Sequence, residues 1–176
     1  NPATVISDYA FSRCTSLSEV NLPANMTGTI GDSAFRRTTA LRAVNGLESV
    51  KSVGSYAFAD SGLTSVTIGE NAEYGEGAFF QSKLVSATIG KNSRFGLGAF
   101  QKCSYLTTVN MPAEGGVHFG SSCFEGDVSL SDIDLRFVDE TIEAQTFYGC
   151  TKLTTANLQN VKYIGDYAFA DCAALS

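Results

Sequence analysis

The dipeptide Ala-Phe, or a close variant of it, recurs so regularly that it constrains the fold more than any other feature of the sequence. It occurs eight times in 176 residues, and successive phenylalanines are 21 to 24 residues apart. A fixed period of this length is typical of solenoids, in which each repeat forms one coil. The phenylalanines are Phe11, Phe35, Phe58, Phe79, Phe100, Phe124, Phe147 and Phe169.

Other residues keep fixed distances from each phenylalanine. An apolar residue precedes it by five positions and usually a glycine by four, as at Ile30 and Gly31. A leucine follows five or six positions later and opens the pattern Leu-x-x-Val-x-Leu, clearest from Leu63 to Ile68. Its period-two alternation predicts a half-buried strand. The second copy departs from this pattern, with Gly46 in the last apolar position and Leu47 just after it.

We therefore predict an α/β fold: a right-handed solenoid of eight repeats, with one short parallel strand per coil and a short helical or 3-10 turn at Ala-Phe. The glycine is expected to permit a left-handed or tightly bent backbone. No coil can bury its apolar face alone, so stability should come from neighbouring coils. Residues 1–176 are expected to form a single domain, cut from a longer protein.

Composition excludes several classes of protein. Hydrophobic residues are 44% and charged residues 17% of the chain, which indicates a folded protein. The formal charge of −6 makes nucleic acid a poor partner. The sequence contains no apolar run long enough to predict a membrane span.

The repeat resembles the BspA-like leucine-rich repeats. The resemblance is clearest in IGDYAFADCAAL (164–175), VGSYAFADSGLTSVTIG (53–69) and SLSEVNLPANMTGTIGDSAF (16–35), and it extends over the whole chain. Members of that family are surface proteins of gut and oral bacteria and of some parasitic protists, associated with adhesion to host proteins such as fibronectin and fibrinogen. The resemblance implies an extracellular or cell-surface binding module, and it assigns no binding residue.

The five cysteines are interpreted as structural. Cys14, Cys103, Cys150 and Cys172 each lie three residues after a phenylalanine, where other copies have Thr, Ser or Asp. Such a position suits a small buried residue whose thiol faces a backbone carbonyl. Cys150 and Cys172 are close enough for a disulfide only if their parallel side chains turn toward each other. We expect free thiols, and no metal or other cofactor.

The single histidine makes catalysis improbable. His118 would have to serve any Ser-His or Cys-His pair, and its neighbourhood, with Gly115 and Gly116, predicts an exposed loop. No phosphate-binding or dinucleotide fingerprint occurs. We therefore predict that the chain is not an enzyme.

The outward positions of the predicted strands are the candidate binding surface. They would form two ladders of small polar side chains along the sheet, which are either a solvated face or a shallow groove for a protein or a glycan. Asp132 and Asp134, with Asp139 and Glu140 downstream, make one end acidic, which could attract a basic segment or a loosely held cation. The candidate residues are Glu19, Asn21, Asn45, Ser65, Thr67, Ser86, Thr88, Thr108, Asn110, Asp132, Asp134, Thr155 and Asn157.

Three functional hypotheses follow. The first is an adhesion or interaction module of a cell-surface or secreted protein, with a host or matrix protein or a cell-surface glycan as its partner. The second is an accessory binding repeat of a larger enzyme or toxin, and the third is a structural spacer. Because neither end shows a polar cap, the terminal coils are also expected to allow end-to-end self-association.

Overall fold

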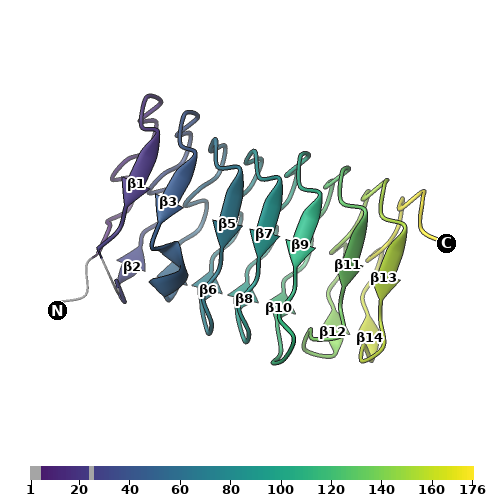
Figure 1. Cartoon of the computed structure of the whole chain (residues 1–176). Helices are drawn as coiled ribbons and strands as arrows, with labels where there is room; N and C mark the ends of the chain where they lie inside the picture. Colours follow the sequence, from purple (N-terminus) through teal and green to yellow (C-terminus); the bar gives the residue numbers. More distant parts are fainter. Residues whose placement is uncertain (1–4, 24–25) are drawn as a thin grey trace.

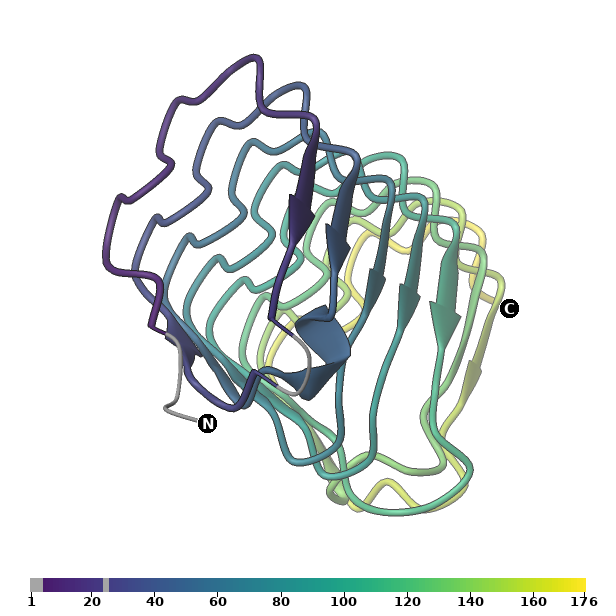
Figure 2. The ribbon, with the colours of Figure 1, turned by 60° about the vertical axis from the view of Figure 1, so that its left-hand side comes forward.

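The computed structural model describes residues 5–23 and 26–176, and these residues wind into a β-solenoid (Figure 1). Fourteen short strands make about seven turns, with two strands in each. Successive coils lie behind one another along the axis of the solenoid (Figure 2). The start of the first coil, on which the predicted absence of an N-terminal cap partly rests, lies outside the described residues.

The odd-numbered strands, which we call the front strands, come from the Leu-x-x-Val-x-Leu pattern. They are parallel and pair in register within three small sheets, β1-β3, β5-β7-β9 and β11-β13. The middle residue of each points inward, as the alternation predicts. The front strands are β1 (Glu19–Asn21), β3 (Ala43–Asn45), β5 (Ser65–Thr67), β7 (Ser86–Thr88), β9 (Thr108–Asn110), β11 (Asp132–Asp134) and β13 (Thr155–Asn157).

A second set of parallel strands, the back strands, ends at the apolar residue five positions before each phenylalanine from Phe35 onward. The sequence analysis predicted only one strand per coil, because two residues are too few to show a period. They pair as β10-β8-β6-β4-β2 and as β12-β14. The back strands are β2 (Thr29–Ile30), β4 (Ser52–Val53), β6 (Glu73–Tyr74), β8 (Arg94–Phe95), β10 (His118–Phe119), β12 (Thr141–Ile142) and β14 (Tyr163–Ile164).

The predicted α/β class and the helical turn at Ala-Phe are not found. The one helix of the described residues is η1, a single 3-10 turn at Leu47–Ser49. Around each phenylalanine, backbone N–H groups instead donate alternately to the neighbouring coil, as from Phe58 to Ala78 (2.7 Å), and to the third residue back, as from Ala59 to Tyr56 (3.1 Å). This pattern requires positive φ angles two residues before and two after the phenylalanine, for example 55° at Tyr56 and 56° at Asp60. We call these segments the turn face.

The predicted reason for the glycine column is also wrong. None of these glycines has a positive φ. A Cβ atom at Gly54 would instead lie 2.6 Å from the backbone nitrogen of Asp32, and one at Gly96 would lie 2.9 Å from that of Glu76. Glycine at these positions allows adjacent coils to approach more closely than a side chain would permit, and the first and seventh copies have Ser7 and Glu143 instead.

The core is a continuous stack of phenylalanine rings. Seven successive pairs have centroids 5.1 to 5.5 Å apart and lie within 12° of parallel. Six of the eight rings are fully buried, whereas Phe11 at the N-terminal end is 38% exposed and Phe169 at the other end is partly buried. The register of the eight Ala-Phe copies therefore matches the prediction, although the strands complete only about seven turns.

Candidate functional site

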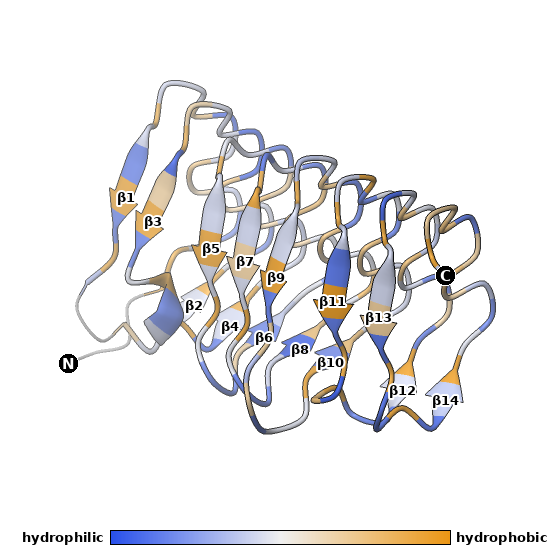
Figure 3. Cartoon of the chain, turned by 45° about the vertical axis from the view of Figure 1, so that its right-hand side comes forward, coloured by the Kyte–Doolittle hydropathy of each residue, from blue (hydrophilic) through white to orange (hydrophobic). Residues whose placement is uncertain are grey.

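The predicted ladder lies on the outer side of the front strands, which we call the front face. Its thirteen residues are all exposed except Ser86 and Asp134, which are partly buried. Register brings them together in rows, for example Ser65, Ser86 and Thr108 on adjacent strands. Figure 3 shows an apolar middle residue between more polar neighbours on β1, β9 and β11. The front face is a flat, polar, regularly spaced surface.

Side chains on the front face hydrogen-bond to one another across the strands. The Asn45 amide donates to Asn21 Oδ1 at 2.8 Å and to Glu19 Oε1 at 2.7 Å, and the Asn110 amide donates to Thr88 Oγ1 at 3.3 Å. Such cross-strand bonds fix the rotamers of the ladder, which lowers the entropic cost of ordering it against a partner.

The front face is interrupted at a cleft between β3 and β5, which the sequence analysis did not predict. These two strands do not pair. Gly46, with φ of 90°, turns the chain into η1, and the cleft is bordered by Asn45, Glu48 and Thr67 with Leu63 and Val66 at its apolar side. The departure of the second copy from the repeat, at Gly46 and Leu47, was the signal that could have located it.

The acidic end of the front face is largely neutralised by basic partners. Arg136 forms a bidentate pair with Asp134, with contacts of 2.6 to 3.0 Å, and the hydrogen bond from this guanidinium lowers the pKa of the Asp134 carboxyl. Lys162 pairs with Glu140 at 2.7 Å. The expectation of a loosely held cation there loses its support.

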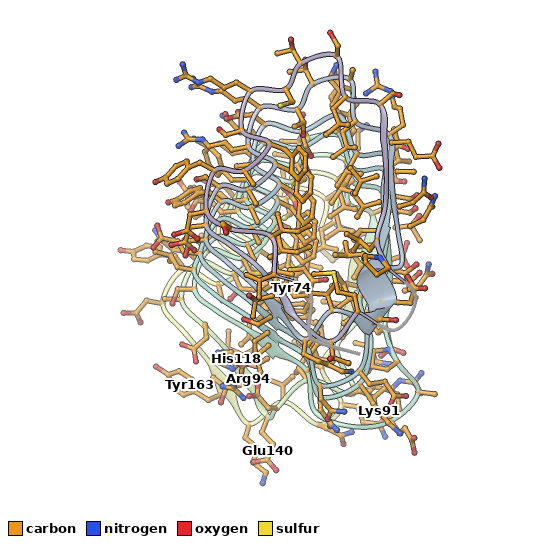
Figure 4. All side chains as sticks on the ribbon, turned by 90° about the vertical axis from the view of Figure 1, so that its left-hand side faces the viewer. Tyr74, Lys91, Arg94, His118, Glu140 and Tyr163 are labelled. Carbon is orange, nitrogen blue, oxygen red and sulfur yellow. The ribbon has the colours of Figure 1, made fainter. Side chains whose placement is uncertain are left out.

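His118 is not an exposed loop residue, contrary to the prediction. It lies in β10 with 24% of its side chain exposed, and its Nδ1 is 2.9 Å from Asp139 Oδ2, while Arg94 reaches the same carboxylate at 3.9 Å. Figure 4 shows His118 and Arg94 side by side on the back strands. The loop itself is exposed as predicted, from Ala113 to Gly116.

Three of the four cysteines that follow a phenylalanine by three residues are buried as predicted, and the prediction is wrong for Cys14, which is exposed. The buried three donate to the phenylalanine carbonyl of the preceding coil, for example from Cys103 to Phe79 at 3.1 Å and from Cys150 to Phe124 at 3.2 Å. All five thiols are free. Within the described residues, no group of three His, Cys, Asp or Glu side chains has the geometry to hold a metal ion.

An aromatic patch on the turn face was missed, because its members come from different repeat positions. The Tyr56 and Phe80 rings meet edge to face at 6.4 Å. Arg36 lies over Tyr56 and Lys102 lies over Phe80, at 5.7 and 6.0 Å. None of these four residues is among the candidate binding residues predicted from the sequence.

Two parallel strand stacks, a phenylalanine column and glycine-mediated coil contacts define a leucine-rich-repeat β-solenoid. The chain belongs to the BspA type leucine rich repeat family, whose six-copy profile matches residues 4–117 and 73–176. A search of the curated proteins finds no significant match. No helix within the described residues is long and apolar enough to cross a bilayer.

Solved structures of bacterial leucine-rich repeat proteins have the same fold. A Bacteroides ovatus protein is 27% identical with a TM-score of 0.70, over 98% of this chain and 51% of its own. The T. pallidum protein TpLRR is 19% identical with a TM-score of 0.65, over 98% and 71%. A Eubacterium ventriosum protein is 16% identical with a TM-score of 0.56, over 98% and 75%. The chain thus spans about half the length of the B. ovatus protein.

Proposed function

We propose that the chain is a non-catalytic interaction module of a cell-surface or secreted leucine-rich-repeat protein, and that it binds its partner with the front face. The observation that supports this most directly is the ladder of small, exposed polar side chains held in register on a rigid sheet. Family membership supports the interaction role, and the resemblance to adhesive surface proteins supports the location. A host or matrix protein, or a cell-surface glycan, is the partner class we propose.

The front face is suited to broad, shallow contact. Serine, threonine and asparagine expose donors and acceptors without large side chains, so a partner can approach the strands closely. No aromatic residue projects from the front strands within the described residues, and aromatic anchors carry most of the affinity at tight interfaces. We therefore expect modest affinity for a single module, increased when several copies act together.

Binding of the purified chain to immobilised fibronectin, fibrinogen and a glycan array, at two salt concentrations, tests the proposal. Thr88→Arg in β7 places a bulky charge on the front face, and Thr29→Arg in β2 is the matched control on the exposed side of a back strand. Loss of at least tenfold in affinity for Thr88→Arg alone supports the front face. Equal effects of both variants would argue against it.

Two other outcomes separate the remaining hypotheses. Absence of binding to every probe favours the spacer, and a catalytic domain in the full-length protein favours the accessory repeat. End-to-end self-association is a separate proposal, because Ile164 in the last back strand is 48% exposed. Light scattering over a concentration series tests it, and a constant monomer mass would contradict it.

A further inference from the structure

Position three after each phenylalanine forms a column of hydrogen-bond donors inside the solenoid. Besides the bonds of Cys103 and Cys150, Cys172 donates to the carbonyl of Phe147 at 3.1 Å, and Thr38 donates to that of Phe35 at 2.6 Å. In each case a thiol or hydroxyl donates to a phenylalanine carbonyl that also accepts a backbone N–H. The cysteines reach the carbonyl of the preceding coil, and Thr38 that of its own coil. The position favours a small polar side chain, and four of its members donate to a phenylalanine carbonyl. The two serines do not: Ser82 hydrogen-bonds the Cys103 thiol, and Ser61 Oγ has no partner.

Asp127 fills this position in the sixth copy and is the only carboxylic acid in the column. Its side chain is fully buried, and neither carboxyl oxygen has a partner within hydrogen-bond distance and angle. The backbone of Cys103 is the one nearby group that favours the ionised carboxyl, and burial outweighs it. The titratable groups that act on it or are affected by it are thiols, those of Cys103, Cys123 and Cys150. Among the described residues, no basic side chain is within ion-pair distance of Asp127. An ionised carboxylate can only accept hydrogen bonds, whereas a protonated carboxyl has an O–H to donate.

The coil that contains Asp127 is also where both strand stacks are interrupted. The front strands lose their pairing between β9 and β11, and the back strands lose theirs between β10 and β12, where only a Val117–Val138 bridge remains. The turn face stays continuous, with Phe100 N–H donating to Cys123 at 2.9 Å and Phe124 N–H donating to Thr146 at 2.8 Å. The coil is thus fixed along one side and weakly joined along the other two.

We propose that this coil is an acid-stabilised joint of the solenoid, closed while the Asp127 carboxyl is protonated and opened toward water when the carboxyl ionises. Protonation gives the carboxyl an O–H that can donate, as the cysteines of this column do, and ionisation leaves a buried charge with no basic partner among thiols. The joint lies between β9 and β11, so opening would separate two parts of the front face. The proposal does not depend on which partner, if any, that face binds.

The direction of the pH dependence follows from burial. Burial raises the pKa of the Asp127 carboxyl well above its usual range. Stability from this group is therefore complete below the ordinary aspartate pKa of 3.8 and is lost as pH rises through the higher pKa of the folded state. Between 3.8 and the pKa of the closed state, each pH unit favours the open form by about tenfold, because opening releases one proton. Above the pKa of the closed state the ratio of the two forms no longer changes with pH, because the carboxyl is ionised in both.

Hydrogen exchange of the whole chain between pH 4 and pH 8 tests the joint, with Asp127→Asn as the variant that cannot ionise. Asp132→Asn, an exposed aspartate in the same coil, is the control. We expect protection of residues 117–150, corrected for intrinsic exchange, to fall by up to tenfold per pH unit in the wild type and the control. In Asp127→Asn it should stay constant.

Asp127→Ser is a second variant that cannot ionise, for use if Asp127→Asn does not fold. Serine is compatible with this position, because Ser61 and Ser82 occupy it in other copies. Asp127→Ser should also be more resistant to urea than the wild type at pH 8, with the difference shrinking at pH 4. A wild-type pH dependence retained in a folded neutral variant would overturn the proposal. So would loss of protection spread evenly over all coils.

Discussion

Truncation of one ring in the middle of the phenylalanine stack tests the central packing argument. Phe58 is fully buried, and its ring lies 5.2 Å from that of Phe35 and 5.5 Å from that of Phe79. Phe58→Ala removes both stacking contacts and leaves a cavity that neighbouring coils cannot close, since their spacing is fixed by the backbone ladders. The expected loss in the free energy of unfolding is about 3–5 kcal/mol.

Tyr56→Ala is the control, two residues away on the turn face. Tyr56 is partly exposed, contacts the edge of Phe80 and hydrogen-bonds Glu76. Removal of such a surface aromatic pair should cost only about 1 kcal/mol. With a urea m-value of about 2 kcal/mol/M, the urea midpoint should fall by about 2 M in Phe58→Ala and by about 0.5 M in Tyr56→Ala. Circular dichroism follows the transition, because the chain contains no tryptophan. Equal shifts would refute the assignment of inward and outward faces.

The same reasoning predicts an effect of position along the stack. Phe11 is 38% exposed and stacks on one ring only, that of Phe35 at 5.1 Å. Since each coil is stabilised by its neighbours, Phe11→Ala should cost well under half of the loss seen for Phe58→Ala. A loss as large as that of Phe58 would mean that the rings do not contribute through local stacking.

Three further predictions concern single positions. Gly96→Ala should lower the free energy of unfolding by about 1–3 kcal/mol, because its Cβ would lie 2.9 Å from backbone atoms of the neighbouring coil. Gly116→Ala is the control and should be nearly neutral, because its nearest contact is at 3.7 Å. Equal urea midpoints for the two variants would contradict this. Tyr74→Phe should raise stability by about 1 kcal/mol, since the buried Tyr74 hydroxyl has no partner. Native thiol titration should label Cys14 rapidly and the others slowly, because burial raises the pKa of Cys150 and Cys103, and all five should react after unfolding.

The sequence was sufficient to predict which residues of successive coils lie next to one another, because the same pattern occurs eight times at nearly constant spacing. The strand at Ser65–Thr67 and its pairing with Ser86–Thr88 follow directly from aligned Leu-x-x-Val-x-Leu segments. Backbone conformation at Ala-Phe was not predictable in the same way. Alanine and phenylalanine are compatible with a helical turn, and the alternative depends on hydrogen bonds to a neighbouring coil, which no local propensity encodes.

The irregular positions were harder to interpret, because each departs from the repeat in only one copy. Gly46 opens the cleft beside β3, and Asp127 places a carboxyl in a column of donors. The spacing of the repeat identifies Gly46 and Asp127 as exceptions, but it does not show the cleft or the buried carboxyl that they produce. For Asp127 the consequence depends on burial and on the thiols of adjacent coils, which are 20 or more residues away along the chain.

These exceptions also indicate how such a solenoid can acquire a function. The positions that the repeat requires are used for packing: phenylalanine fills the core, glycine allows the coils to approach, and cysteine or threonine donates to a carbonyl. Chemistry and recognition are therefore left to positions that the repeat does not specify, which lie on the front face and the turn face, and to single departures from it. A regular solenoid presents a uniform surface, whereas an interrupted ladder beside a buried carboxyl can change that surface with acidity. If the joint at Asp127 opens, a partner that spans β9 and β11 should bind more tightly at acidic pH, and one confined to β5, β7 and β9 should not.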